Sequence, residues 1–155
     1  MHPKILKAMI DQAQKITLTS RAFHNTSLGD FADYLTNLIG YEKFIPMNTG
    51  CEADETACKM ARRWGYRVKG IPSDQAMILF PTGNFWGRSI TASGACDDPS
   101  RYTDFGPFTA GFDLFKYDDL VDLKAKLEAN PNICAVCVEP IQGEGGVIIP
   151  SDGYL

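Results

Sequence analysis

The sequence has 155 residues, a formal net charge of −4 at pH 7 and 45% hydrophobic residues, which is typical of a globular protein. An acidic chain without a basic stripe argues against a nucleic-acid partner. No apolar run reaches the roughly 18 residues that a membrane helix needs. We therefore expect neither a nucleic acid nor a membrane among the partners.

Hydrophobic spacing and helix-ending residues divide the chain into helices and strands. The helices that we expect cover residues 1–15, 27–40 and 51–66, a short stretch after Trp86, and residues 118–130. The strands that we expect cover residues 76–80, the end of 112–117, 133–140 and 146–150. This alternation favours an α/β fold, with a mostly parallel sheet and helices on both of its faces.

The five cysteines are unevenly spaced, which is more typical of a reducing intracellular compartment than of a disulfide framework. Cys134 and Cys137 form a C-x-x-C pattern inside the expected strand 133–140. Because side chains alternate along a strand, residues three apart should face opposite sides of the sheet. We therefore predict that the two thiols pack in the interior and do not form a metal or redox site.

The junction at Thr49 and Gly50 is the first candidate site, because a helix begins there after a short apolar segment. Amides at a helix N-terminus lack partners within the helix, and glycine lets an anion approach the backbone. Thr49 and Glu52 also fit a capping box, in which each side chain bonds the backbone amide of the other residue. On this stretch alone capping is the favoured interpretation, and anion binding is the alternative.

A second candidate site follows the expected strand 76–80, since ligands of parallel sheets bind beyond the carboxyl ends of the strands. Phe85 and Trp86 lie there between two glycines, and Arg88 comes next. The aromatic side chains could stack on a flat ring while the arginine binds a carboxylate. Equally, the two rings could fill the core beside a solvated arginine.

The third candidate site follows the strand that begins at residue 133. Glu139 ends this apolar segment, and Glu144 lies in the glycine-rich stretch after it. A carboxylate at a buried strand end is costly unless it is paired or used, although an exposed turn is the alternative. An anion cradle, a stacking ring with an arginine, and carboxylates would together suit a phosphorylated planar cofactor such as pyridoxal phosphate.

Five segments of the sequence resemble the ornithine aminotransferases of the class-III pyridoxal-phosphate-dependent aminotransferase family. These segments are ITLTSRAFHN (16–25), PMNTGCEADETACKMARRWGY (46–66), GNFWGRS (83–89), DFGPFTAGFD (104–113) and VEPIQGEGGVIIP (138–150). The resemblance covers the whole chain. It implies that residues 1–155 form part of the large domain of a fold-type-I transferase, as an internal fragment whose parent continues at both ends.

The resemblance also implies which residues bind the cofactor, pyridoxal 5'-phosphate. The backbone amides of Gly50 and Cys51 match the positions that hold the phosphate group. Phe85 matches the aromatic residue that stacks on the pyridine ring, and Trp86 beside it is a further candidate. Glu139 matches a family carboxylate that lies beside the cofactor.

Two further residues match substrate-binding positions of the family. Arg88 matches the arginine that receives the α-carboxylate of L-ornithine. Glu144 matches a glutamate that pairs with a distant arginine in the switch between ornithine and 2-oxoglutarate. None of the lysines matches the Schiff-base lysine, so we expect no catalytic residue in this chain and no activity from it alone.

The implied reaction transfers the terminal amino group of L-ornithine to 2-oxoglutarate, giving glutamate 5-semialdehyde and glutamate. The family resemblance further implies a homodimer or a higher homo-oligomer in the mitochondrial matrix, with the cytoplasm as the alternative location. Two other functions stay open from the sequence. One is an acetylornithine or 4-aminobutyrate aminotransferase, and the other is a truncated, non-catalytic interaction module.

Overall fold

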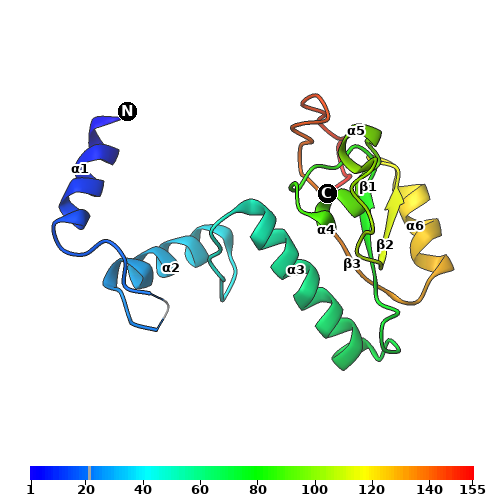
Figure 1. Cartoon of the computed structure of the whole chain (residues 1–155), viewed down its shortest axis with the longest axis horizontal. Helices are drawn as coiled ribbons and strands as arrows, with labels where there is room; N and C mark the ends of the chain where they lie inside the picture. The colour runs from blue at the N-terminus through cyan, green and yellow to red at the C-terminus, as the bar shows by residue number, and fades with distance from the viewer. Residues whose placement is uncertain (21) are drawn as a thin grey trace. The chain divides into compact units, whose positions relative to one another are not determined.

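The computed structural model describes residues 1–20 and 22–155, and these form two compact units (Figure 1). The first unit is Met1–Pro46 and the second is Met47–Leu155. Each unit is described by itself. Along the part of the chain that the structure describes, no helix is both long enough and apolar enough to cross a bilayer.

The first unit contains two helices, α1 (Pro3–Ala13) and α2 (Thr26–Ile39). Both were expected, but α2 begins one residue earlier than predicted because Asn25, rather than Ser27, caps it and accepts a hydrogen bond from the Ser27 amide. Gly40 ends the helix in the left-handed conformation, with φ of 74°, as its position predicts. None of the described residues of this unit is buried.

The second unit is built around a parallel sheet of three strands, in the order β2-β1-β3. The strands are β1 (Met77–Pro81), β2 (Phe112–Phe115) and β3 (Ile133–Val136). The helices are α3 (Gly50–Trp64), the π-helix η1 (Gly65–Lys69), α4 (Ile90–Gly94), α5 (Pro99–Tyr102) and α6 (Leu120–Ala129). The predicted helix 51–66 therefore continues as a π-helix beyond its expected end.

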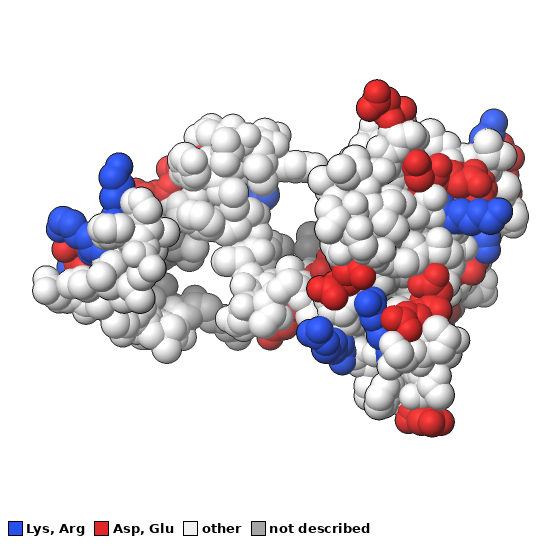
Figure 2. Space-filling view, turned by 90° about the horizontal axis from the view of Figure 1, so that it is seen from above, with Lys and Arg blue, Asp and Glu red and all other residues white. Residues whose placement is uncertain are grey.

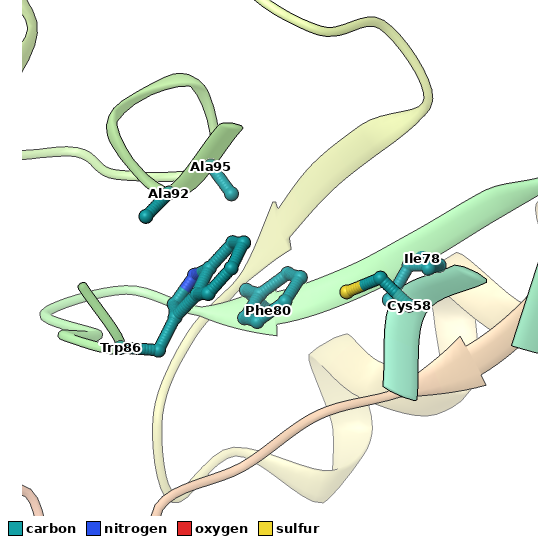
Figure 3. Packing of buried hydrophobic residues seen from close by; sticks show 6 residues of the cluster. All are labelled: Cys58, Ile78, Phe80, Trp86, Ala92 and Ala95. Atoms are coloured by element: carbon teal, nitrogen blue, oxygen red, sulfur yellow. The ribbon is translucent and has the colours of Figure 1, made fainter. Parts of the chain in front are cut away.

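Hydrophobic clusters lie on both faces of the sheet. On one face, α3 packs on β1 and β3, and the buried residues of that cluster are Cys58, Ile78, Phe80, Trp86, Ala92 and Ala95 (Figure 3). Along β1 the side chains alternate, so Leu79 joins the opposite cluster with Phe115 and Ile133, against which Leu123 of α6 packs. The predicted α/β fold, with helices on both faces of a parallel sheet, is confirmed.

The segment 146–150 is not the strand that its apolar sequence predicts. It contributes one isolated antiparallel bridge, between Gln142 and Ile148. Val147 has a φ of 56° and Gly146 a φ of 114°, and these left-handed conformations interrupt an extended strand. The strand predicted for residues 133–140 is also shorter than expected, because β3 ends at Val136.

An irregular register in β3 overturns one prediction about the cysteines. Met77 pairs with Ile133, but Ile78 pairs with Ala135, so Cys134 is an extra residue between the two pairs. Such a bulge shifts the alternation of side chains by one position. As a result, Cys134 and Cys137 both pack against the cluster under α3, and the prediction that they face opposite sides is wrong.

The expected packing role of these thiols nevertheless agrees with their contacts. Cys134 and Cys137 pack against the same cluster that contains Cys58, and all five cysteines are free. Burial raises the pKa of the Cys58 and Cys137 thiols to about 11. Both therefore stay protonated near neutral pH, where a protonated thiol is a poor nucleophile and metal ligand.

Candidate functional site

The N-terminus of α3 is capped by the side chain that the sequence predicts. The hydroxyl of Thr49 accepts a hydrogen bond from the Glu52 amide at 3.2 Å. The return bond differs from a standard capping box, because the Glu52 carboxylate accepts from the amide of Asn48 at 3.1 Å, one residue before the cap. Both interactions leave the first two amides of the helix unused.

Those two amides belong to Gly50 and Cys51. Within the described residues, neither of them donates a hydrogen bond to another group of the protein. They lie at the positive end of the dipole of a 15-residue helix. The capping and anion-binding interpretations are therefore compatible, since capping uses the Glu52 amide and an anion would use the two before it.

The loop that follows β1 meets this helix N-terminus. A Cβ on Gly87 would lie 2.8 Å from the Cβ of Cys51, so only glycine allows this close approach. Ser89 follows Arg88 in the same loop, and its hydroxyl donates a hydrogen bond to the Glu55 carboxylate of α3 at 2.5 Å. Two of the sites singled out in the sequence are thus adjacent in the structure.

The same loop is held in place by polar contacts from three directions. The carboxylate of Asp97 accepts from the Gly83 amide at 2.9 and 3.1 Å. The side-chain amide of Asn84, which is 3% exposed, donates to the carbonyls of Pro81 and Ala95 at 2.8 Å each. These contacts tie the loop to the end of β1 and to the segment that follows α4.

Glu139 supplies the third direction and connects the loop to the chain beyond β3. Its carboxylate accepts from the Phe85 amide at 2.8 Å and from the Gly143 amide at 3.2 Å. The residue is half-buried. The strand-end carboxylate is therefore paired rather than free, and it is neither in an exposed turn nor left without partners.

Phe85 and Trp86 have different environments, although the sequence offers the same two interpretations for both rings. Trp86 is 9% exposed and stacks on Phe80, with ring centroids 5.1 Å apart and planes 11° apart (Figure 3). Its ring fills the core, so the core interpretation is right for Trp86. Phe85 is only half-buried and its ring lines an open pocket.

That pocket has a volume of about 480 Å³ and is lined by Phe85, Arg88, Arg101 and Glu144, among others. The guanidinium carbon of Arg88 lies 5.1 Å from the centroid of the Phe85 ring, and that of Arg101 lies 4.8 Å from it. Two cations therefore lie over one aromatic ring, and one carboxylate lines the same pocket. Such a pocket suits a small molecule with a flat part and anionic groups.

A smaller cavity of about 90 Å³ is lined by Phe85, Trp86, Asp54 and Glu139, among others. Burial raises the pKa of Asp54, and the nearby charge of Glu139 raises it further. Among the described residues, the indole nitrogen of Trp86 and the side-chain oxygen of Asn84 are buried without a hydrogen-bond partner. The loop that carries Phe85 therefore keeps one hydrogen-bond donor, on Trp86, and one acceptor, on Asn84, that no described protein group uses.

Phe85, Arg88 and Glu144 line one pocket, whereas the ring of Trp86 fills the core. Glu139 holds the Phe85 amide, and Cys51 lies against Gly87 of the same loop. These groups fit a phosphorylated planar cofactor, because unused amides lie beside a loop that presents a half-buried aromatic ring. Sequence analysis did not single out Asp54, Asp97 or Arg101. The sequence pattern around each of them is weak, since each is one charged residue among others in a helix or loop. Only the folded structure places them at the site.

Figure 2 shows acidic and basic side chains interspersed over the face that it presents. In the pocket itself the charges are arranged differently, since Arg88 and Arg101 both lie over one ring. The pocket therefore places two arginines over one ring, with the Glu144 carboxylate in its lining and the Asp98 carboxylate paired with Arg101.

Comparison with known proteins identifies the relatives of this chain. The mitochondrial ornithine aminotransferase of Drosophila ananassae is 56% identical over 154 residues, which cover 99% of this chain and 35% of that protein. The ornithine aminotransferase of Toxoplasma gondii, a crystal structure with partial occupancy of PLP at its active site, has 46% identity and a TM-score of 0.95, covering 99% of this chain and 36% of that one.

An acetylornithine aminotransferase from Elizabethkingia anophelis is more distant, with 40% identity and a TM-score of 0.78, covering 99% of this chain and 34% of that one. The chain thus spans about a third of the length of these relatives. The family model described as aminotransferase class-III matches residues 1–155, the whole chain. The chain therefore belongs to the class-III aminotransferase family.

Proposed function

We propose that this chain is part of the large domain of a pyridoxal-phosphate-dependent ornithine aminotransferase. The proposed reaction transfers the terminal amino group of L-ornithine to 2-oxoglutarate and yields glutamate 5-semialdehyde and glutamate. One observation carries the proposal: Cys51 at the N-terminus of α3 lies against Gly87, in the loop whose Phe85 and Arg88 line a pocket together with Glu144. The similarity to ornithine aminotransferases supports it.

Three residues of this chain would hold the cofactor. The amides of Gly50 and Cys51 would donate to its phosphate, helped by the dipole of α3. Phe85 would stack on its ring, and the bond from the Phe85 amide to Glu139 would fix where that ring lies. When bound, pyridoxal phosphate supplies an electron sink for the carbon from which a proton is removed.

Two residues would bind the substrates. Arg88 is exposed to the pocket, and its planar guanidinium can hold a carboxylate through two parallel hydrogen bonds. We assign to it the α-carboxylate of ornithine. Glu144 lines the same pocket, and we assign to it the pairing with an arginine that distinguishes the two substrates.

Replacing Arg88 tests the proposed function in the full-length enzyme. Arg88→Ala removes charge-assisted bonds to the carboxylate, so we expect the KM for ornithine to rise about tenfold or more, and to rise more than that for 2-oxoglutarate. Steady-state kinetics with each substrate varied in turn measures both values. Arg63→Ala, an exposed arginine at the end of α3, is the control. Unchanged KM values for Arg88→Ala would contradict the assignment.

The related acetylornithine aminotransferase makes that activity the second candidate. A 4-aminobutyrate aminotransferase would be a third variant of the same chemistry. Wild-type enzyme assayed with each of the three amine donors at equal concentration discriminates among them, since we expect the highest kcat/KM with ornithine. A higher value with N-acetylornithine or 4-aminobutyrate would replace the proposed substrate but not the family.

We also propose a homodimer or a higher homo-oligomer, located in the mitochondrial matrix. The location is supported by relatives that are named mitochondrial, and the cytoplasm is the alternative. A fluorescent fusion of the full-length protein, imaged beside a matrix marker, tests the location. The mass of the purified full-length protein in solution tests the oligomeric state.

A further inference from the structure

Arg101 is a charged residue of the pocket to which neither the family resemblance nor the proposed function gives a role. It lies in α5 and lines the pocket together with Phe85, Arg88 and Glu144. Its guanidinium carbon is 4.8 Å from the centroid of the Phe85 ring. Arg88 lies about as far from the same ring, so the two guanidinium groups are within about 10 Å of each other.

The guanidinium of Arg101 is held in position before any ligand arrives. Its Nε pairs with the Asp98 carboxylate at 3.1 Å, and its Nη1 donates to the carbonyl of Asn84 at 3.4 Å. Asp98 is itself fixed, because it accepts from the amide and the hydroxyl of Ser100 at 2.9 and 2.8 Å. Few rotamers of Arg101 therefore remain to be lost when a ligand binds.

Arg101 also keeps donors that these contacts do not use. A guanidinium has five N–H bonds, and the hydrogen bond to Asn84 engages one of them while Nε forms the ion pair with Asp98. The side chain is 29% exposed, and it is exposed toward a pocket rather than enclosed by protein on all sides. The remaining N–H groups can reach an anionic group of a ligand in that pocket.

We propose that Arg101 is a second carboxylate-recognition residue, which acts together with Arg88 on an anionic group bound in the pocket. The ligand class is a small carboxylate. Arg101 is thus a specificity-determining residue and not only a support for the loop. This inference rests on the proposed function for the identity of the substrates, but not for the existence of a carboxylate site.

Glutarate is the probe for this site, since it is a dicarboxylate that has neither an amino nor a keto group to react. Its dissociation constant is measured by calorimetry on the full-length enzyme. We expect Arg101→Ser to weaken glutarate binding about tenfold, because a charge-assisted bond is lost. Arg101→Lys keeps the charge but not the planar fork, so it should restore part of the affinity. Arg63→Ser removes an exposed arginine of α3 and serves as the matched control.

The variant Asp98→Asn tests whether Arg101 recognises a carboxylate or only supports the loop. This variant removes the negative charge that partly neutralises Arg101, while an amide oxygen can still accept from Ser100. If Arg101 recognises carboxylates, Asp98→Asn should weaken glutarate binding much less than Arg101→Ser does, because the charge of Arg101 remains and only a contact that orients it is lost. If Arg101 only supports the loop, both Asp98→Asn and Arg101→Ser should lower the melting temperature and weaken glutarate binding alike, and that result would overturn the proposal.

Kinetics of the same variants keep this inference separate from the proposed function. With Arg101→Ser we expect the KM values of the substrates to rise while kcat changes less than twofold, as is typical of lost binding. If the wild type fails to use ornithine but glutarate binding still depends on Arg101, the proposed function fails and the inference holds. Glutarate affinity that is unchanged in Arg101→Ser would refute the inference even in an active ornithine aminotransferase.

Discussion

At the scale of single residues, Glu139 connects three parts of the site. It lies beyond β3, and its two carboxylate oxygens accept from the amides of Phe85 and Gly143. Glu139 holds the backbone amide of Phe85, and the backbone sets where the Phe85 ring lies. The position of the ring therefore depends on a residue 54 positions away in the sequence. A carboxylate suits this task, since both of its oxygens are acceptors.

Glu139→Gln tests this connection through stability. Glutamine keeps one acceptor oxygen but turns an NH₂ donor toward one of the two amides, so one charge-assisted bond is lost. We expect the free energy of unfolding to fall by about 1.5–3 kcal/mol, measured by urea denaturation. Glu144→Gln is the matched control, because Glu144 is exposed and should change the value by less than about 0.5 kcal/mol. Equal effects of the two substitutions would contradict the role of Glu139.

At the scale of elements, the N-terminal part of α3 faces the segment that follows β3. Asp54 of α3 and Glu139 line the same small cavity, where burial first and the charge of Glu139 second raise the pKa of Asp54. A folded state with a raised carboxyl pKa binds its proton more tightly than the unfolded chain does. Stability is therefore lost as pH rises from the ordinary value of 3.8 through the raised value.

Asp54→Asn should remove that loss. We expect the free energy of unfolding of the variant, minus that of the wild type, to increase as pH rises through this window and then to level off. Denaturation between about pH 4 and about pH 7 measures the difference, and working with differences cancels the other titrating groups. The increase should be smaller in a Glu139→Gln background, where one of the two causes is absent. A difference that falls with rising pH would show that the sign is wrong.

At the scale of the whole molecule, the two units differ in how well they bury their own surfaces. The second unit has hydrophobic clusters on both faces of its sheet. In the first unit none of the described residues is buried, and apolar side chains such as Ile5, Met9 and Leu38 are largely exposed. Short helices without a buried face have little to stabilise them in water.

Limited proteolysis of the isolated 155-residue chain tests this difference. We expect cleavage within residues 1–46 well before cleavage in residues 47–155, since local opening costs least where few apolar contacts are lost. Mass spectrometry of the fragments over time gives the order of cleavage. Protection of the first unit for as long as the second would contradict the expectation.

Much of the fold followed from sequence patterns that are local. The glycine after α2 and the threonine before α3 act through their immediate neighbours, and the helix ends that they mark were predicted closely. The position of β1 was predicted to within one residue. β2 instead lies at the start of residues 112–117 rather than at their end, and β3 is shorter than predicted. The segment 146–150 was mistaken for a strand because apolar composition does not reveal positive φ angles. The C-x-x-C thiols were placed on opposite faces because a bulge in β3 leaves no mark in the spacing of residues.

By itself the sequence determined the alternation of strands and helices, the capped N-terminus of α3 and the resemblance to one family, because periodicity, capping and motifs depend on residues close together in the chain. Only the tertiary structure decided that Trp86 fills the core while Phe85 lines the pocket, that Glu139 holds the Phe85 amide, and that Arg101 lies over the same ring as Arg88. The contact between Phe85 and Arg101 joins residues 16 positions apart, and the hydrogen bond between Phe85 and Glu139 joins residues 54 positions apart. Their geometry is set by how the loops at the strand ends pack against one another, which no local pattern encodes.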